Sequence, residues 1–114
     1  MKRVQAVIRP ERLETVQRSL AELGFHGLMV VDVRGHGSET STKGEYRGAP
    51  FAVSVKHKLM LDLVVEDDEV ASAVDAISRA AHTGQVGDGL IFVVDVAAVY
   101  QIRSMVMGEA ALRD

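Results

Sequence analysis

The chain has 114 residues, which is enough for one domain and too few for two of ordinary size. Its 47% apolar content provides for a packed core, and its formal net charge of −3 argues against a nucleic-acid binder, which normally carries a basic patch. The absence of cysteine excludes disulfides and fits a cytoplasmic location. Residues 1–10 contain no long apolar run, so we expect neither a signal peptide nor insertion into a membrane.

The first third of the chain predicts a strand, a helix and a second strand. Residues 2–9 alternate apolar and polar side chains and stop at Pro10, which is typical of a strand. Residues 11–23 place apolar side chains three and four positions apart, as one face of a helix does, and Gly24 is a natural stop. Residues 27–34 are mostly apolar and β-branched, which predicts the second strand.

Residues 35–49 differ from the segments on either side. They are rich in glycine, serine and threonine and contain almost nothing apolar. Such a segment cannot bury itself, so we expect a long, mobile, exposed loop, with order resuming near Val53. Loops of this length inside a compact domain are uncommon and usually functional.

The second half repeats the order of the first. Residues 58–65 predict a strand, and the acidic residues 66–69 fit a solvated helix start, where the helix dipole favours negative charge. The helix that follows carries one apolar face, made of Val70, Val74, Ile77 and Ala81. A glycine-rich segment, residues 83–89, then leads into a predicted strand over residues 90–96.

Two strand-helix-strand halves predict an α+β fold, the ferredoxin-like βαββαβ sandwich, with a long loop between its second and third strands. In this fold four antiparallel strands form one sheet and both helices cover the same face. Apolar residues are expected on both sheet faces, for example at Leu28, Val30, Met60, Val64, Ile91 and Val93. Because the face without helices would be bare and apolar, we predict a homo-oligomer.

The glycine-rich segment is the first candidate for chemistry. Its backbone N–H groups could approach an anion, or its glycines could simply form a tight turn between helix and strand. It matches neither a phosphate-binding Walker motif nor a dinucleotide-binding fingerprint. Gly35-His36-Gly37 allows the same two interpretations, as a hinge or as a ligand contact. The four histidines lack the spacing of metal ligands and no catalytic constellation stands out, so we do not expect an enzyme.

Three segments carry a family resemblance. They are Ala6 to Pro10 at the start, Tyr46-Arg47-Gly48-Ala49 followed by Phe51, and residues 83–93. Together they resemble the sequence signatures of the PII nitrogen-regulatory signal transduction proteins. The resemblance extends from Met1 to about Arg103, which predicts one domain over residues 1–103 and a divergent tail over residues 104–114.

The resemblance implies a trimer of ferredoxin-like subunits with adenine nucleotide, as ATP, ADP or AMP, in each cleft between subunits. The implied nucleotide-binding residues are Val7, Gly35, His36, Gly37, Ser38, Asp62, Val64, Gly87, Asp88, Gly89, Leu90 and Arg103, the last from the neighbouring subunit. The resemblance also implies a T-loop, about residues 36–54, in which Tyr46, Arg47 and Phe51 meet a target protein. An ammonium channel, another membrane transporter or a metabolic enzyme would be such a target, in nitrogen or carbon metabolism.

Departures from the family pattern modify this expectation. Phe51 replaces a tyrosine that can be uridylylated, and Glu39 replaces a glutamine that helps to hold magnesium and 2-oxoglutarate. A carboxylate at Glu39 can still ligate magnesium, but it should repel 2-oxoglutarate, a dicarboxylate. The expected binding site also loses cations and a threonine, because the chain has Ser38, Leu90 and Gln101 for cations and Met29 for the threonine.

Each missing charge-assisted hydrogen bond would contribute roughly 1.5–3 kcal/mol, so a triphosphate should lose the most affinity. ADP, AMP or a cyclic nucleotide could still bind through backbone N–H groups and Arg103. Two classes of function therefore stay open. One is a nucleotide sensor that acts through its T-loop, and the other is an interaction module that binds a membrane transporter whether or not nucleotide is present.

Overall fold

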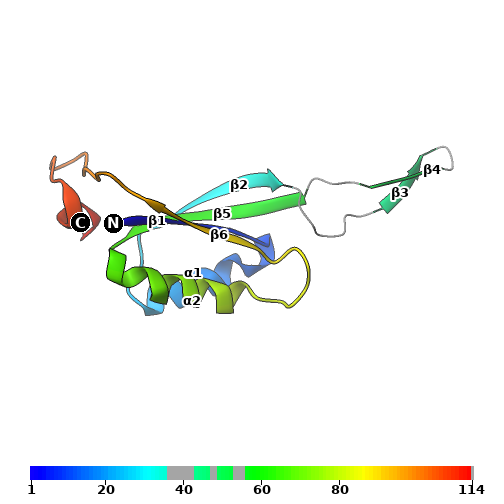
Figure 1. Cartoon of the computed structure of the whole chain (residues 1–114), viewed down its shortest axis with the longest axis horizontal. Helices are drawn as coiled ribbons and strands as arrows, with labels where there is room; N and C mark the ends of the chain where they lie inside the picture. Colours follow the sequence, from blue (N-terminus) through cyan, green and yellow to red (C-terminus); the bar gives the residue numbers. More distant parts are fainter. Residues whose placement is uncertain (36–42, 47–48, 53–55, 114) are drawn as a thin grey trace.

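The computed structural model describes residues 1–35, 43–46, 49–52 and 56–113. Its main elements follow the predicted order of strand, helix, strand, insertion, strand, helix and strand (Figure 1). They are β1 (Lys2–Ile8), α1 (Leu13–Glu22), β2 (Met29–Gly35), β5 (Lys56–Val65), α2 (Val70–Ala81) and β6 (Gly89–Asp95). Short 3₁₀ turns, η1 (Pro10–Arg12) and η2 (Asp67–Glu69), lead into the two helices.

The four long strands form one sheet in the order β2-β5-β1-β6, and every neighbouring pair is antiparallel. The register places Ala6 of β1 between Leu61 of β5 and Ile91 of β6. Both helices lie on the same side of this sheet (Figure 1). The predicted ferredoxin-like sandwich is therefore confirmed.

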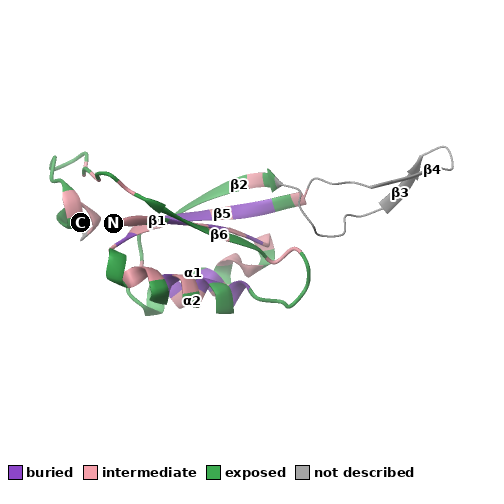
Figure 2. Cartoon of the chain, viewed as in Figure 1, coloured by how far each residue is buried: buried purple, intermediate pink, exposed green. Residues whose placement is uncertain are grey.

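The core lies between the sheet and the two helices. Alternate residues of β1 and β5 face the helices and are buried. On β1 the residues between them are more accessible, whereas on β5 Lys58 and Asp62, on the other face, are buried as well. Leu61 of β5, Leu20 of α1 and Ile77 of α2 have no exposed surface. Figure 2 shows the buried residues concentrated on β5 and on the inner sides of the helices. The apolar spacing thus predicted the packed face of each helix, except for Leu23, which follows α1 and is 50% exposed.

Specific polar contacts fix the ends of the helices. The side chain of Glu66 accepts a hydrogen bond from the backbone of Glu69, whose carboxylate in turn accepts one from the N–H of Glu66 at 2.9 Å, which is a capping box. At the other end of α2, the Arg12 guanidinium donates to the carbonyl of Ala80 from Nε at 2.9 Å and Nη2 at 2.6 Å. Within the described residues, no helix is long and apolar enough to cross a lipid bilayer.

The insertion between β2 and β5 contains regular structure that the sequence analysis did not predict. Strands β3 (Lys43–Tyr46) and β4 (Ala49–Ala52) pair antiparallel as a separate two-stranded sheet (Figure 1). The prediction of a loop without order until Val53 was wrong for these two segments. It rested on the lack of apolar residues, whereas strand pairing needs only backbone donors and acceptors.

The sheet face without helices is apolar along its edges. Met29 and Val31 of β2 and Leu90, Phe92 and Val94 of β6 are exposed there, with Leu90 65% and Met29 62% exposed. Patches of exposed large apolar side chains mark contact surfaces. This face is the one that the sequence analysis expected to be covered in a homo-oligomer.

The C-terminal segment continues from β6 at the end of the sheet that lies away from the insertion (Figure 1). Its backbone folds back on itself, with an isolated bridge between Tyr100 and Met107 and a 3₁₀ turn, η3 (Gly108–Arg113). Ile102 and Met105 are 92% and 75% exposed. Residues 104–113 are therefore connected to residues 99–101 by backbone hydrogen bonds across the predicted boundary at residue 103.

Candidate functional site

Residues 83–89 connect α2 to β6 and form the glycine loop. The Asp88 carboxylate accepts the hydrogen bonds that hold this loop in shape. The Asp88 carboxylate accepts hydrogen bonds from the backbone N–H groups of Thr83 at 2.8 Å and Gly84 at 2.9 Å, and from the Thr83 hydroxyl. These bonds, the one from the Thr83 hydroxyl first, hold the pKa of Asp88 well below its ordinary value. An ionised Asp88 thus joins the end of the glycine loop to its beginning at Thr83 and Gly84.

Gly89 joins the glycine loop to β6 at a point where no other residue fits. Its φ of +112° is a conformation that L side chains rarely adopt. A Cβ atom at this position would lie 1.7 Å from the carbonyl oxygen of Val7 on the neighbouring strand β1. Glycine is therefore required for the loop to meet the sheet.

Two cations hold the glycine loop from outside. The Arg9 guanidinium donates to the Asp88 carboxylate from Nε at 3.1 Å and to the Val86 carbonyl from Nη2 at 2.9 Å. The Lys58 ammonium, whose residue is only 6% exposed, donates to the Gly87 carbonyl at 2.6 Å. The loop is thus tied to the ends of β1 and β5.

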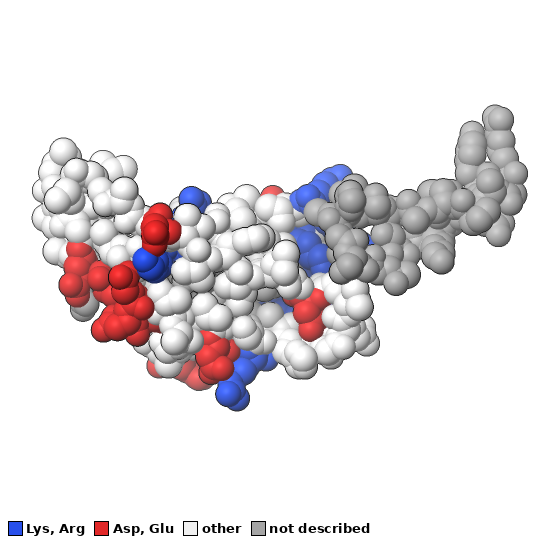
Figure 3. Space-filling model, in the orientation of Figure 1, with Lys and Arg blue, Asp and Glu red and all other residues white. Residues whose placement is uncertain are grey.

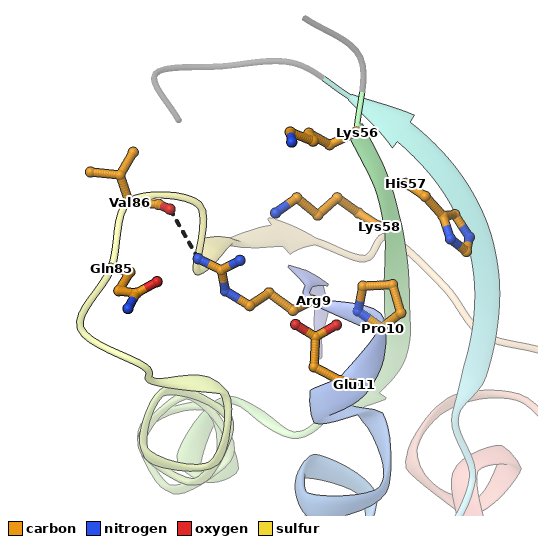
Figure 4. Close-up of a pocket in the computed structure, with 8 residues that line it drawn as sticks. All are labelled: Arg9, Pro10, Glu11, Lys56, His57, Lys58, Gln85 and Val86. Carbon is orange, nitrogen blue, oxygen red and sulfur yellow. Dashed lines mark hydrogen bonds between the residues drawn. The ribbon is translucent and has the colours of Figure 1, made fainter. Parts of the chain in front are cut away.

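A pocket of about 420 Å³ opens between these elements. Its lining consists of Arg9, Pro10, Glu11, Lys56, His57, Lys58, Gln85 and Val86. The side chains of Arg9, Lys56 and Lys58 come from two strand ends and extend toward the glycine loop (Figure 4). His57 points to the other side of β5, where its Nε2 lies 3.2 Å from an Asp32 carboxylate oxygen. The pocket is therefore cationic on the side that faces the loop.

The distribution of charge agrees with this local picture. Figure 3 shows basic side chains gathered beside the insertion, with acidic ones among them, and most of the acidic side chains toward the opposite end of the molecule. The acidic end includes the start of α2, where Asp67, Asp68 and Glu69 occupy one turn. An anionic ligand is favoured at the end that holds the glycine loop.

The pocket also lies at the root of the insertion. Gly35 at the end of β2 pairs with Lys56 at the start of β5, and this is the last pair between the two strands. The insertion leaves the sheet after Gly35 and returns at Lys56, which lines the pocket. A ligand held here would contact one end of the segment that the sequence analysis called the T-loop.

The structure divides the predicted nucleotide-binding residues into two groups. The first group surrounds the glycine loop and contains Gly87, Asp88 and Gly89, with Val7 and Leu90 paired just inside the sheet. The second group lies toward the other end of the sheet. There Asp62, Val64 and the substituted Met29 line a separate hollow of about 710 Å³.

Arg103 falls in neither group. It belongs to the C-terminal segment, which follows the end of β6 that lies away from the glycine loop (Figure 1). It is exposed in the C-terminal segment. Of the other predicted residues, Gly35, Tyr46 and Phe51 lie in strands for which only the backbone is described. The predictions for His36, Gly37, Ser38, Glu39 and Arg47 concern residues outside the described ranges.

Sequence analysis missed the cations of the pocket, Arg9, Lys56 and Lys58. It counted charges only on the glycine loop, in the insertion and in the tail. Lys56 and Lys58 are two residues apart on one strand and so share a face, which is a signal that the sequence does contain. Their meeting with Arg9 depends on the register, in which Ile8 lies opposite Leu59.

Taken together, these features define a ferredoxin-like fold with a pocket lined by basic side chains at the root of a long insertion. Comparison with known proteins identifies the family. The family model described as "Nitrogen regulatory protein P-II" matches residues 1–105. The chain belongs to the P-II family of nitrogen regulatory signal transduction proteins.

Individual relatives support the assignment. The chain is 43% identical over 112 residues to Nitrogen regulatory protein P-II 1 of Escherichia coli strain K12, covering 98% of this chain and 100% of that protein. It is 41% identical over 112 residues to the protein of the same name from Methanothermobacter thermautotrophicus, at 98% and 97% coverage. A crystal structure of Arabidopsis thaliana PII bound to citrate matches with a TM-score of 0.80 and 34% identity, covering 96% of this chain and 90% of that one.

Family membership settles the general function. Members of the P-II family are regulatory signalling proteins that form trimers, bind nucleotides and act on target proteins. The chain is accordingly a signal transduction protein of nitrogen regulation, in agreement with the resemblance seen in its sequence.

Proposed function

We propose that this chain assembles as a homotrimer and senses adenine nucleotide in the clefts between its subunits. The observation that carries the proposal is the convergence of Arg9, Lys56 and Lys58 on the side of the pocket that faces the glycine loop. Positive charge beside a glycine-rich turn suits the phosphate groups of a nucleotide. The Arabidopsis relative crystallised with citrate, another polyanion, which supports the binding of small anions in this fold.

The division of the predicted residues supports a site between subunits. The glycine loop would hold the phosphates of the nucleotide, and Val7 would contribute apolar surface beside it. Met29, Asp62 and Val64 lie together in a hollow that is separate from the pocket in one chain. In this proposal a neighbouring copy brings its Arg103 to the glycine loop, because within one chain the C-terminal segment lies at the other end of β6 (Figure 1).

Charge decides which nucleotide this site prefers. Leu90 and Gln101 stand where the family resemblance implies cations, so the site has lost charge on two sides. The pocket keeps Lys56, Lys58 and Arg9, the last already paired with Asp88, and this limited positive charge suits a diphosphate better than a triphosphate. We therefore propose ADP as the preferred ligand, with ATP and AMP as weaker ones. Glu39 is the proposed magnesium ligand, and its negative charge disfavours 2-oxoglutarate.

The nucleotide would act on the T-loop, residues 36–54, because the pocket lies where the insertion returns to the sheet. A ligand that binds one arrangement of the insertion more tightly shifts the population toward it. In this proposal the selected arrangement presents Tyr46, Arg47 and Phe51 to a target in the cytoplasm. The target is a membrane transporter or a metabolic enzyme, and the chain itself catalyses no reaction.

Isothermal titration calorimetry with ATP, ADP, AMP and cyclic AMP tests the nucleotide proposal. We expect binding of ADP, and a loss of affinity of roughly 10-fold or more in the variants K56M and K58M, because each removes a charged hydrogen-bond donor. The variant R79M is a matched control, since Arg79 is exposed on α2 and pairs with Asp75 at 2.9 Å. It should bind ADP as the unmodified protein does.

Two results would contradict the proposal. The absence of measurable binding by all four nucleotides at millimolar concentration would remove the nucleotide-sensing part. Capture of the same target with equal yield in the presence and absence of ADP would instead favour a constitutive interaction module. The subunit count is measured separately, by native mass spectrometry.

A further inference from the structure

A polar cluster interrupts the apolar face of the sheet that the helices leave bare. The Arg3 guanidinium on β1 donates to the Asp62 carboxylate on β5, from Nε at 2.9 and 3.0 Å and from Nη2 at 2.5 Å. The amide of Gln5 lies 3.4 Å from the same carboxylate. Both strands are inner strands of the sheet, so the cluster lies in the middle of this face.

The surroundings of the cluster are apolar. Met29 lies beside Asp62 on β2, Val94 lies beside Arg3 on β6, and Phe92 lies beside Gln5. The Asp62 side chain is only 4% exposed, whereas the Arg3 side chain is 46% exposed. Any molecule that covers this face therefore buries the positive charge of Arg3 together with the apolar side chains around it.

A second copy of this chain fits such a face. Members of the family form trimers, and Arg3 and Asp62 cancel each other's charge within each subunit. The face of one copy can thus meet another copy without excess charge of either sign. The pair must stay complete, however, because a lone charge inside an apolar contact is strongly unfavourable.

We propose that the Arg3–Asp62 pair makes assembly conditional: copies associate through this face only when both charges are present or both are absent. Arg3 and Asp62 are positioning residues of the contact between subunits, a role separate from the nucleotide contact that the family resemblance implies for Asp62. The inference rests on the homotrimer of the proposed function, and it adds which polar residues control that assembly.

Native mass spectrometry and size-exclusion chromatography with light scattering test the proposal on four variants of the full chain. They are R3M, D62L, the double variant R3M/D62L and the control K2M. Lys2 precedes Arg3 on β1 and pairs instead with Asp95, which is 86% exposed at the sheet edge. Far-UV circular dichroism at each dilution shows whether a dissociated subunit stays folded.

We expect R3M and D62L to raise the subunit concentration needed for assembly by about 100-fold or more, since each leaves one buried charge unpaired. R3M/D62L and K2M should assemble as the unmodified protein does. Single variants that assemble as K2M does would overturn the inference while leaving the proposed homotrimer intact. So would a double variant that dissociates as the single ones do. A single subunit in the unmodified protein would instead overturn the homotrimer itself.

Discussion

The helix-covered core and the glycine loop lie next to each other but are stabilised in different ways. In the core, Leu20, Leu61 and Ile77 are completely buried, and the free energy comes from apolar area and close packing. In the glycine loop, Asp88 and Arg9 make directional hydrogen bonds to particular backbone atoms. The stability of the core therefore depends on how well side-chain volume is filled, whereas the stability of the loop depends on particular hydrogen-bonding atoms. Matched substitutions should affect the two regions differently.

The largest effect is expected in the core. Leu61→Ala leaves a cavity at a completely buried position, so the free energy of unfolding should fall by about 2–5 kcal/mol. Leu61→Met keeps most of the volume and should cost less than about 1.5 kcal/mol. Urea denaturation at one fixed subunit concentration measures both, because association also stabilises the folded chain. Equal losses in the two variants would contradict the volume argument.

Two glycines in the loop provide the next comparison. Gly89→Ala should lower the free energy of unfolding by more than the 1–2 kcal/mol or so expected for positive φ alone, because the new Cβ also meets the Val7 carbonyl. Gly84→Ala is the matched control. Its φ is +86°, but the nearest atom to a Cβ there belongs to the His82 side chain, at 3.7 Å. A Gly84 variant as unstable as the Gly89 variant would show that contact with the sheet is unimportant.

A smaller effect is expected when the anchor of the glycine loop is changed. Asp88→Ala removes every acceptor that the carboxylate offers to Thr83, Gly84 and Arg9, so the melting temperature should fall. Asp88→Asn keeps the shape and one acceptor oxygen, so the fall should be smaller. Differential scanning fluorimetry ranks the two. In the core, by contrast, Leu61→Met keeps most of the volume and should preserve most of the stability.

The same carboxylate predicts how stability depends on pH. The pKa of Asp88 is lower in the folded chain than the ordinary value near 4, which the unfolded chain retains. Its contribution to stability is complete above the unfolded pKa and declines as the pH falls toward the folded pKa. Melting temperatures measured from pH 5 to pH 2 should therefore fall less steeply in Asp88→Asn. An identical slope in both proteins would contradict this assignment.

The smallest effect is expected on the outer surface of α2. Arg79→Met breaks an ion pair with Asp75, four residues earlier, in which both side chains are mostly exposed. Such pairs contribute about 0.3–0.5 kcal/mol, so the urea midpoint should hardly move. A large loss here would mean that the surface of α2 makes contacts that one isolated subunit does not show.

Most of the fold could be predicted from the sequence, because its signals are local. The three- and four-residue spacing of Leu13, Val16 and Leu20 marks the face of α1 that packs on the sheet, and alternation marks β1. The strands β3 and β4 could not be predicted in this way. Their pairing depends on backbone groups, and their residues show neither pattern.

The candidate site could be predicted only in part. Gly87, Asp88 and Gly89 stand out in the sequence as a glycine-rich turn, but the sequence does not say which atoms hold it. The structure adds that Arg9 and Lys58 do so, and that Gly89 is required by a single carbonyl on β1. These contacts join residues 29 to 82 positions apart, so no local pattern could have revealed them.

The sequence by itself determined the class of fold, the family and the place of the glycine loop, because composition, periodicity and signature residues are properties of neighbouring positions. Only the tertiary structure decided that Arg9, Lys56 and Lys58 share one pocket and that Arg3 neutralises Asp62 in the bare sheet face. The physical reason is that charges interact according to their distance in space. In this protein the register of β1 against β5 sets those distances.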